Sequence, residues 1–140
     1  AICGGSKAGE DALTAAEEVL GAVGLVVRVP ERLMDAVTAL SGSGPAYVFY
    51  LAEALTDAGV GLGLPRDVAT RLGEHTIAGA SRLLVDSDLA PAELRAQVTS
   101  PGGTTAAAIG RLEHHAVRAA FLDALEAAAR RSRELGEAFF

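Results

Sequence analysis

The residues best placed to do chemistry are the seven from Thr99 to Thr105, which read Thr-Ser-Pro-Gly-Gly-Thr-Thr. They include two adjacent glycines and the hydroxyls of Ser100, Thr104 and Thr105, and an alanine-rich segment of helical character follows directly. Glycine lets a ligand approach the main chain closely, and the first N–H groups of a helix lack partners within it and carry partial positive charge. We therefore predict an anion pocket here, with hydroxyls placed to orient the bound group. The residues leave open an alternative, in which Ser100 or Thr104 simply caps the helix and the Pro-Gly dipeptide is an ordinary turn.

A second run of the same design, Ser-Gly-Ser-Gly-Pro, occupies residues 41–45 and also leads into a predicted helix. A single Ser or Thr suffices for a helix cap. Repeated glycine therefore indicates backbone held close to something else. That neighbour is either a ligand or another helix, and the residues leave both open.

Other kinds of chemistry have little support in the sequence. The three histidines, His75, His114 and His115, have no second ligand at helical spacing, so we predict no metal site. The only lysine, Lys7, lies near the N-terminus, which argues against Schiff-base catalysis in the rest of the chain. Cys3 has no nearby base that would make it a nucleophile. Any chemistry must rest on positioning and on hydroxyl and backbone donors.

The composition limits the class of protein. Half of the 140 residues are hydrophobic, yet only 4% are aromatic, and the Ala, Leu and Val content is typical of closely packed helices. A net charge of −6 argues against a nucleic-acid or anionic-membrane partner. The single cysteine excludes an internal disulfide and points to a reducing compartment. No apolar run reaches the roughly 18 residues that a membrane span needs. We expect a soluble, cytoplasmic protein.

The first 30 residues differ from the rest. Apolar spacing predicts a helix over Asp11–Ala22, and the β-branched run Leu25–Val29 predicts a strand that has no obvious partner downstream. One strand cannot satisfy its own backbone groups. We therefore interpret residues 1–30 as the remnant of an α/β domain whose earlier strands lie upstream, which the missing initiating Met agrees with. A disordered or partner-completed segment is the alternative.

Residues 31–140 predict a mainly α domain, a glycine- and alanine-rich helical bundle. We expect a helix over Glu31–Leu40, a break at Ser41–Gly44, and a helix from Pro45 to the glycines at 59–63. Two further helices are expected over Pro65–Val85 and Pro91–Val98. After the Ser-Pro-Gly-Gly run we expect one helix that ends at about His114 and a last one over Ala116–Leu135, with Gly136 as its stop. The helix that contains Tyr47–Leu55 is apolar on nearly every side and needs neighbours all round. Because roughly 110 residues supply few neighbours, we expect an intertwined dimer that buries this helix.

Two long segments carry a family resemblance. Asp35–Tyr47 and Val98–Thr105, with the spacing between them, closely resemble signature segments of pyrroline-5-carboxylate reductase, as do Gly61–Pro65 and Arg131–Leu135. The resemblance covers essentially the whole chain. It implies an upstream Rossmann domain that binds NADPH or NADH, of which residues 1–30 are the last helix and strand. It also implies that residues 31–140 are the helical dimerisation and substrate-binding domain, in a homodimer that can assemble into rings.

The resemblance also implies an activity, the reduction of the C=N bond of 1-pyrroline-5-carboxylate to L-proline by hydride from the nicotinamide cofactor. The substrate carboxylate would bind backbone donors of Gly102, Gly103 and Thr104, with help from the Ser100 hydroxyl. Thr105 would be catalytic, with its hydroxyl facing the ring nitrogen and no strong acid required.

The cofactor would meet this chain at Ser41, Gly42 and Ser43, which are expected to flank the nicotinamide. The glycine fingerprint for a pyrophosphate is absent from the sequence, so we expect the chain to be a fragment that neither binds cofactor nor turns over alone. A non-catalytic helical dimerisation module, in which the glycine runs serve packing only, remains the alternative. Another imine or 2-oxoacid reductase on the same scaffold is a third possibility.

Overall fold

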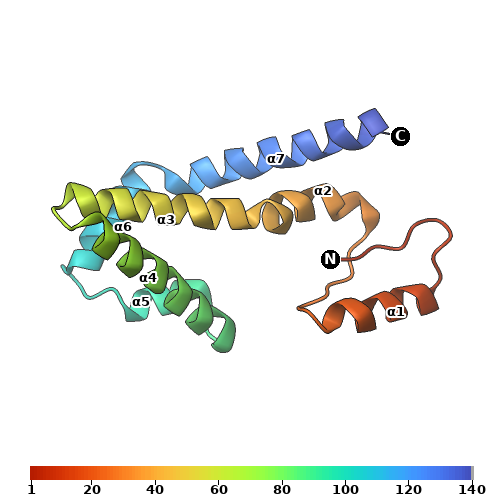
Figure 1. The fold of residues 1–140 in the computed structure, drawn as a ribbon, viewed down its shortest axis with the longest axis horizontal. Helices are drawn as coiled ribbons and strands as arrows, with labels where there is room; N and C mark the ends of the chain where they lie inside the picture. Colours follow the sequence, from red (N-terminus) through yellow and green to blue (C-terminus); the bar gives the residue numbers. More distant parts are fainter. Residues whose placement is uncertain (140) are drawn as a thin grey trace. The chain divides into compact units, whose positions relative to one another are not determined.

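The computed structural model describes residues 1–139, and most of these residues are helical (Figure 1). The elements are α1 (Glu10–Gly21), the 3₁₀ turn η1 (Glu31–Leu33), α2 (Met34–Val37), the π-helical turn η2 (Thr38–Gly42), α3 (Gly44–Gly61), α4 (Arg66–Asp86), α5 (Pro91–Gln97), α6 (Thr104–His114) and α7 (Val117–Phe139). The predicted mainly α fold is confirmed. The chain divides into two compact units, which are described separately: a first unit of Ala1–Gly44 with the chain from Leu122 onward, and a second unit of Pro45–Phe121.

The predicted strand at Leu25–Val29 is wrong as a regular strand. A single parallel bridge pairs Ile2 with Arg28, and residues 1–139 contain no longer ladder. The Ile2 N–H donates to the Val27 carbonyl at 2.9 Å, and the Val29 N–H donates to the Ile2 carbonyl at 3.0 Å. The partner therefore lies upstream at Ile2, and the crossover between the two segments contains α1, as a parallel pair requires.

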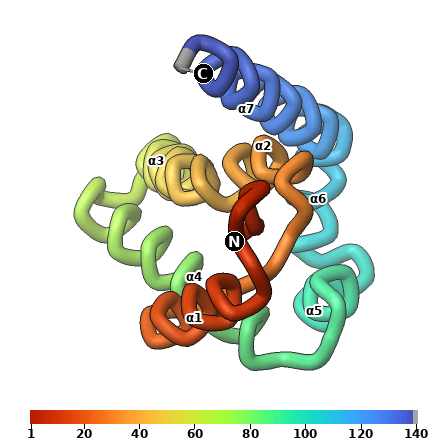
Figure 2. Tube along the Cα trace, turned by 90° about the vertical axis from the view of Figure 1, so that its right-hand side faces the viewer, coloured from red at the N-terminus to blue at the C-terminus, as the bar shows by residue number. Residues whose placement is uncertain are grey.

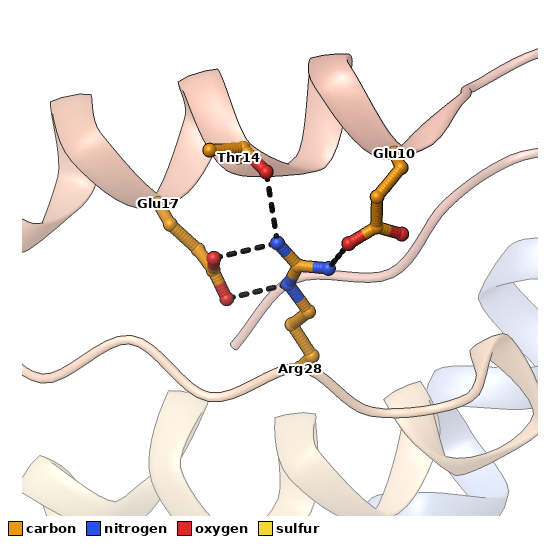
Figure 3. Close-up of polar contacts among 4 residues, drawn as sticks. All are labelled: Glu10, Thr14, Glu17 and Arg28. Atoms are coloured by element: carbon orange, nitrogen blue, oxygen red, sulfur yellow. Dashed lines mark hydrogen bonds and ion pairs between the residues drawn. The ribbon is translucent and has the colours of Figure 1, made fainter.

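Helix α1 is tied to the bridged segment by Arg28 (Figure 3). Its Nε and Nη2 donate to the two carboxylate oxygens of Glu17 at 2.6 and 2.7 Å. Nη2 also donates to Thr14 Oγ1 at 3.3 Å, and Nη1 pairs with Glu10. The hydrogen bonds from Arg28 lower the pKa of Glu17, and those to Glu17 and Glu10 raise the pKa of Arg28. Positions 10, 14 and 17 lie on one face of a helix, so the arginine fixes which side of α1 faces the bridge.

The expected break at Ser41–Gly44 is also wrong. Helical backbone continues from Met34 through Gly42, and Ser43 keeps a helical conformation with φ −86° and ψ −14° before α3 begins. The Ser43 N–H reaches back five residues to the Thr38 carbonyl at 2.8 Å. A π turn of this kind absorbs an extra residue without opening a loop, which is why the glycines do not interrupt the helical path.

In the second unit, α3 and α4 follow one another through a short loop (Figure 2). The contact between the two helices is made by small residues. A Cβ added at Gly59 would lie 3.0 Å from the Ala69 Cβ, and one added at Gly73 would lie 3.6 Å from the Leu55 Cβ. Ala69 is 3% exposed. The glycines at 59 and 73 therefore serve close helix packing. Gly63 makes the loop with φ +98°, a conformation that suits glycine.

The remaining helix bounds agree with the sequence apart from the end of α7. Helix α5 begins at Pro91 as predicted and ends at Gln97, one residue before the predicted Val98. At its start the Glu93 carboxylate accepts a hydrogen bond from the Ala90 N–H at 2.8 Å. Gly136 does not stop α7, which runs on to Phe139. A single glycine costs a helix only about 1 kcal/mol, so its presence alone does not terminate a long helix. No helix among the described residues is long and apolar enough to cross a membrane.

Candidate functional site

The turn before α6 lies in the second unit and is built by Gly102 and Gly103. Gly102 has φ +69°, in the left-handed region that favours glycine. Gly103 is the N-cap of α6, and a Cβ added there would lie 3.1 Å from the Ser100 carbonyl oxygen. Neither glycine has a neighbouring helix within 4 Å of such a Cβ. The two glycines therefore serve the shape of the turn, in contrast to the packing glycines of α3 and α4.

The start of α6 is not closed by a side chain. The N-cap residue is Gly103, which has no side chain. The Ser100 and Thr104 hydroxyls make no hydrogen bond to another described residue, so the alternative in which one of them caps the helix is wrong. The Ala107 N–H donates to the carbonyl of the N-cap residue Gly103 at 3.1 Å, the first bond of the α6 pattern. The N–H groups of Thr104, Thr105 and Ala106 precede that bond and have no helical acceptor. This arrangement suits a bound anion.

One expected donor is already engaged. The Gly103 N–H donates to the Ser100 carbonyl at 3.0 Å and closes the turn. The expectation of a free Gly103 amide is therefore not met in this conformation. The donors that the helix start leaves open are those of the residues that follow, beginning with Thr104.

Three hydroxyls surround this helix start. Ser100 and Thr104 are exposed, whereas Thr105 is half-buried, and none of the three makes a side-chain hydrogen bond to another described residue. Thr99 differs, because its hydroxyl donates to the Arg95 carbonyl at 2.6 Å and is committed to the end of α5. The open hydroxyls are thus those that the sequence predicted for the site.

A cavity between α5 and α6 adjoins this turn, and sequence reasoning missed it. Its volume is about 470 Å³, and its lining includes Arg95 and Thr99 of the α5 end and Ala106 and Gly110 of α6. The Arg95 guanidinium lies 3.9 Å from Glu113, a loose pairing that leaves it partly available. The signal in the sequence was the position of Arg95, four residues before Thr99 in a predicted helix. This arginine brings positive charge to a region of an otherwise acidic chain.

The second predicted segment, Ser41–Ser43, lies in the first unit and is organised differently. The Ser41 hydroxyl donates to the Val37 carbonyl at 3.0 Å and so supports the π turn. Pro45 has no N–H, so the Ser41 carbonyl lacks its ordinary donor four residues on. A Cβ added at Gly42 would make only ordinary contact with Thr38 at 3.7 Å. The segment therefore lies in a π turn, a feature that occurs often at functional sites.

Titratable and metal-binding groups are absent from both segments. No group of three His, Cys, Asp or Glu within residues 1–139 is placed to hold a metal ion. His114 and His115 lie at the end of α6 with their rings 5.2 Å apart, edge to face. His75 lies on α4. Proton transfer at the α6 start would therefore depend on hydroxyls.

Comparison with known proteins decides the family. Residues 31–135 match the family model described as pyrroline-5-carboxylate reductase dimerisation. The chain belongs to the pyrroline-5-carboxylate reductase family. This family assignment confirms the resemblance of the signature segments, but it does not test the roles of individual residues.

The similarity extends along nearly the whole chain. The pyrroline-5-carboxylate reductase of Synechocystis is 48% identical over 137 residues, which are 98% of this chain and 51% of that protein. The solved structure of a Coxiella burnetii pyrroline-5-carboxylate reductase is 42% identical with a TM-score of 0.90, over 95% of this chain and 50% of that one. A Plasmodium falciparum pyrroline carboxylate reductase, solved with NADP bound, is 32% identical with a TM-score of 0.84, over 94% of this chain and 53% of that one. The chain therefore spans about half the length of the relatives it matches.

Proposed function

We propose that this chain is the helical, substrate-binding part of a reductase that converts 1-pyrroline-5-carboxylate to L-proline with NADPH or NADH. The observation that carries the proposal is the start of α6, where a two-glycine turn leaves a helix N-terminus without a side-chain cap. An uncapped helix start attracts a carboxylate. Membership of the family supplies the substrate class that fits it.

The substrate carboxylate is assigned to the turn and the first residues of α6. Gly102 and Gly103 shape the backbone around it, the Thr104 amide donates to it, and the Ser100 hydroxyl reaches it from the other side of the turn. The closed Gly103–Ser100 bond supports a role for Gly103 in holding the turn, with its amide shared between Ser100 and the carboxylate. Arg95 in the neighbouring cavity adds positive charge.

The Thr105 hydroxyl is assigned to face the ring nitrogen of the pyrroline substrate. Its side chain is half-buried one residue into the helix, which is consistent with a hydroxyl that stays in one orientation. A protonated imine is already a strong electrophile, so the hydroxyl needs only to hold the nitrogen and the proton it carries. NAD(P)H, when bound, supplies the hydride. The absence of His, Lys, Asp or Glu from residues 99–105 agrees with a reaction of this kind.

The nicotinamide end of the cofactor is assigned to Ser41, Gly42 and Ser43. The Ser41 carbonyl lacks its helical donor because of Pro45, and an acceptor of this kind suits the NH₂ of a carboxamide. The NADP in the Plasmodium structure supports use of this class of cofactor. Because the sequence contains no Gly-x-Gly-x-x-Gly, the rest of the cofactor must bind elsewhere in the enzyme.

A homodimer is part of the proposal, with α3 buried by a second copy and further assembly into rings. Large apolar side chains of α3 are open in the single chain, with Phe49 66% and Tyr50 74% exposed. The dimerisation model that matches residues 31–135 supports the same conclusion and fits a domain boundary after residue 30.

The direct test is Thr105→Ala in the complete protein that carries this chain, assayed by oxidation of NAD(P)H with pyrroline-5-carboxylate. We expect kcat to fall about 100-fold, the usual scale for loss of a positioned donor. The dimer should persist in sedimentation, and Thr105→Ser should recover most of the rate because it keeps the hydroxyl. Unchanged kinetics in Thr105→Ala would remove this residue from the mechanism.

The alternative of a purely structural module has support only at α3 and α4, where Gly59 and Gly73 make close packing contacts. A titration of the 140-residue chain with L-proline separates the two. Chemical-shift changes confined to residues 99–105 support the site, and their absence up to high millimolar proline supports the module.

A further inference from the structure

A half-buried hydrogen bond inside the first unit connects α7 with α2. The Ser132 hydroxyl of α7 donates to Asp35 Oδ1 at 2.7 Å, although the two residues are 97 positions apart in the sequence. Both side chains are half-buried. A hydrogen bond to a carboxylate is stronger than one between neutral groups, and partial burial limits its replacement by water. The contact therefore fixes α2 to α7 at one point.

Asp35 lies three residues before the π turn η2, which contains Ser41 and Gly42 of the segment assigned to the nicotinamide. Helical backbone runs without interruption from α2 into η2. The Ser41 hydroxyl holds the Val37 carbonyl at 3.0 Å, and the Ser43 N–H holds the Thr38 carbonyl at 2.8 Å. These bonds and the continuous helical backbone tie residues 35–43 into one hydrogen-bonded segment. A displacement of Asp35 is therefore carried to Ser41 and Ser43.

The partner that Asp35 uses shows what the contact provides. Arg131 and Arg133 flank Ser132 on α7, yet the carboxylate binds the hydroxyl, and Arg131 pairs with Glu134 at 2.9 Å instead. A serine has one side-chain torsion before its oxygen, whereas an arginine has a long and adaptable stem. The hydroxyl thus holds Asp35 at a fixed distance from the α7 backbone, which a longer cation would not do.

We propose that Ser132 is a positioning residue. Through its hydrogen bond to Asp35, it sets the position of the Ser41–Ser43 turn relative to the nicotinamide end of the cofactor. The inference rests on the proposed function. It predicts an effect on cofactor use that is separate from any effect on substrate binding at the α6 start, because Ser132 and Asp35 belong to the first unit only.

The test is Ser132→Ala in the complete enzyme, with the dissociation constant of NADPH measured by fluorescence titration without substrate. Michaelis constants are measured separately for NAD(P)H and for pyrroline-5-carboxylate. We expect the dissociation constant and the KM for NAD(P)H to rise about tenfold, the scale of a lost hydrogen bond to a charged group, with the KM for pyrroline-5-carboxylate unchanged. Ser132→Thr keeps the hydroxyl and should restore the wild-type KM. The control is Ser81→Ala, which removes an exposed hydroxyl from α4 and should change neither constant.

The possible outcomes distinguish failure of the proposed function from failure of the inference about Ser132. If the wild-type enzyme does not oxidise NAD(P)H with pyrroline-5-carboxylate, the proposed function and this inference both fail. If it does, and Ser132→Ala leaves the KM for NAD(P)H unchanged, only the inference fails. Equal rises in both Michaelis constants together with a lower melting temperature, not recovered by Ser132→Thr, mean that the contact serves general stability and also overturn the inference.

Discussion

Two junctions of nearly the same composition, residues 41–45 and 100–104, take different structures. At the first, the Ser43 N–H bonds to Thr38, and the chain passes through a π turn without leaving helical conformation. At the second, the Gly103 N–H bonds to Ser100, Gly102 adopts a positive φ, and a new helix begins with its first amides open. A run of glycine and serine therefore does not by itself predict an open helix start.

The preceding chain decides between the two outcomes. The first junction follows a helical stretch whose carbonyls can accept bonds from residues 41–43, such as Val37 from the Ser41 hydroxyl. The second follows α5, which has already been closed by Thr99: its N–H donates to Ala96, and its hydroxyl donates to Arg95. With the last turn of α5 closed in this way, the next residues have no helix to continue. The open start of α6 is thus a consequence of how the previous helix ends.

The largest expected effect comes from adding the same side chain at both junctions. Gly103→Val places its Cβ 3.1 Å from the Ser100 carbonyl oxygen, so the turn must move, whereas Gly44→Val meets nothing within 4 Å of its Cβ. The neighbouring Ser100 backbone must give way by a few tenths of an ångström. Because a full 1 Å misplacement costs on the order of 100-fold in rate, this smaller displacement should cost about tenfold. We expect kcat/KM for pyrroline-5-carboxylate to fall by that factor in Gly103→Val and by less than threefold in Gly44→Val, measured in steady-state assays of the complete enzyme. Equal losses in the two variants would contradict a special role for the second junction.

The sequence predicted the second junction better than the first, for physical reasons. The amino-acid types at 99–105 determine the main features of the turn, because only glycine tolerates the φ of Gly102 and the space at Gly103. The π turn was not predictable, because it depends on whether the Ser43 amide bonds four or five residues back, and the composition is compatible with either. The pairing of Ile2 with Arg28 was missed because one residue at a chain end gives no periodic signal. The predicted end of α7 was wrong because Gly136 was expected to terminate the helix, whereas a single glycine costs a helix only about 1 kcal/mol.

A smaller effect, on stability, tests the conformation of the second junction. Gly102→Ala forces an alanine to adopt φ +69°, which costs about 1–2 kcal/mol relative to ordinary helical or extended backbone. Gly44→Ala, the matched change at the first junction, requires no positive φ and should alter the free energy of unfolding by less than about 0.5 kcal/mol. Urea unfolding of the 140-residue chain at a fixed protein concentration measures both. Equal stability of the two variants would mean that residue 102 does not hold a left-handed conformation in solution.

The smallest expected effect is a pH dependence of local stability, which should differ between α1 in the first unit and the second junction. Glu17 in the first unit has a pKa below its ordinary value because it accepts hydrogen bonds from Arg28. A depressed carboxyl pKa adds stability above the ordinary value, and that stability is lost as the pH falls through the folded value. No titratable side chain occurs between Thr99 and Thr105. Acidification below pH 4 should therefore loosen α1 from Arg28 before it alters the second junction, with a modest effect because the pair is exposed and screened by salt. Amide exchange followed by NMR at pH 3 to 6 should show loss of protection in α1, and Glu17→Gln should already show that loss at pH 6, whereas residues 99–107 should be the same in both proteins.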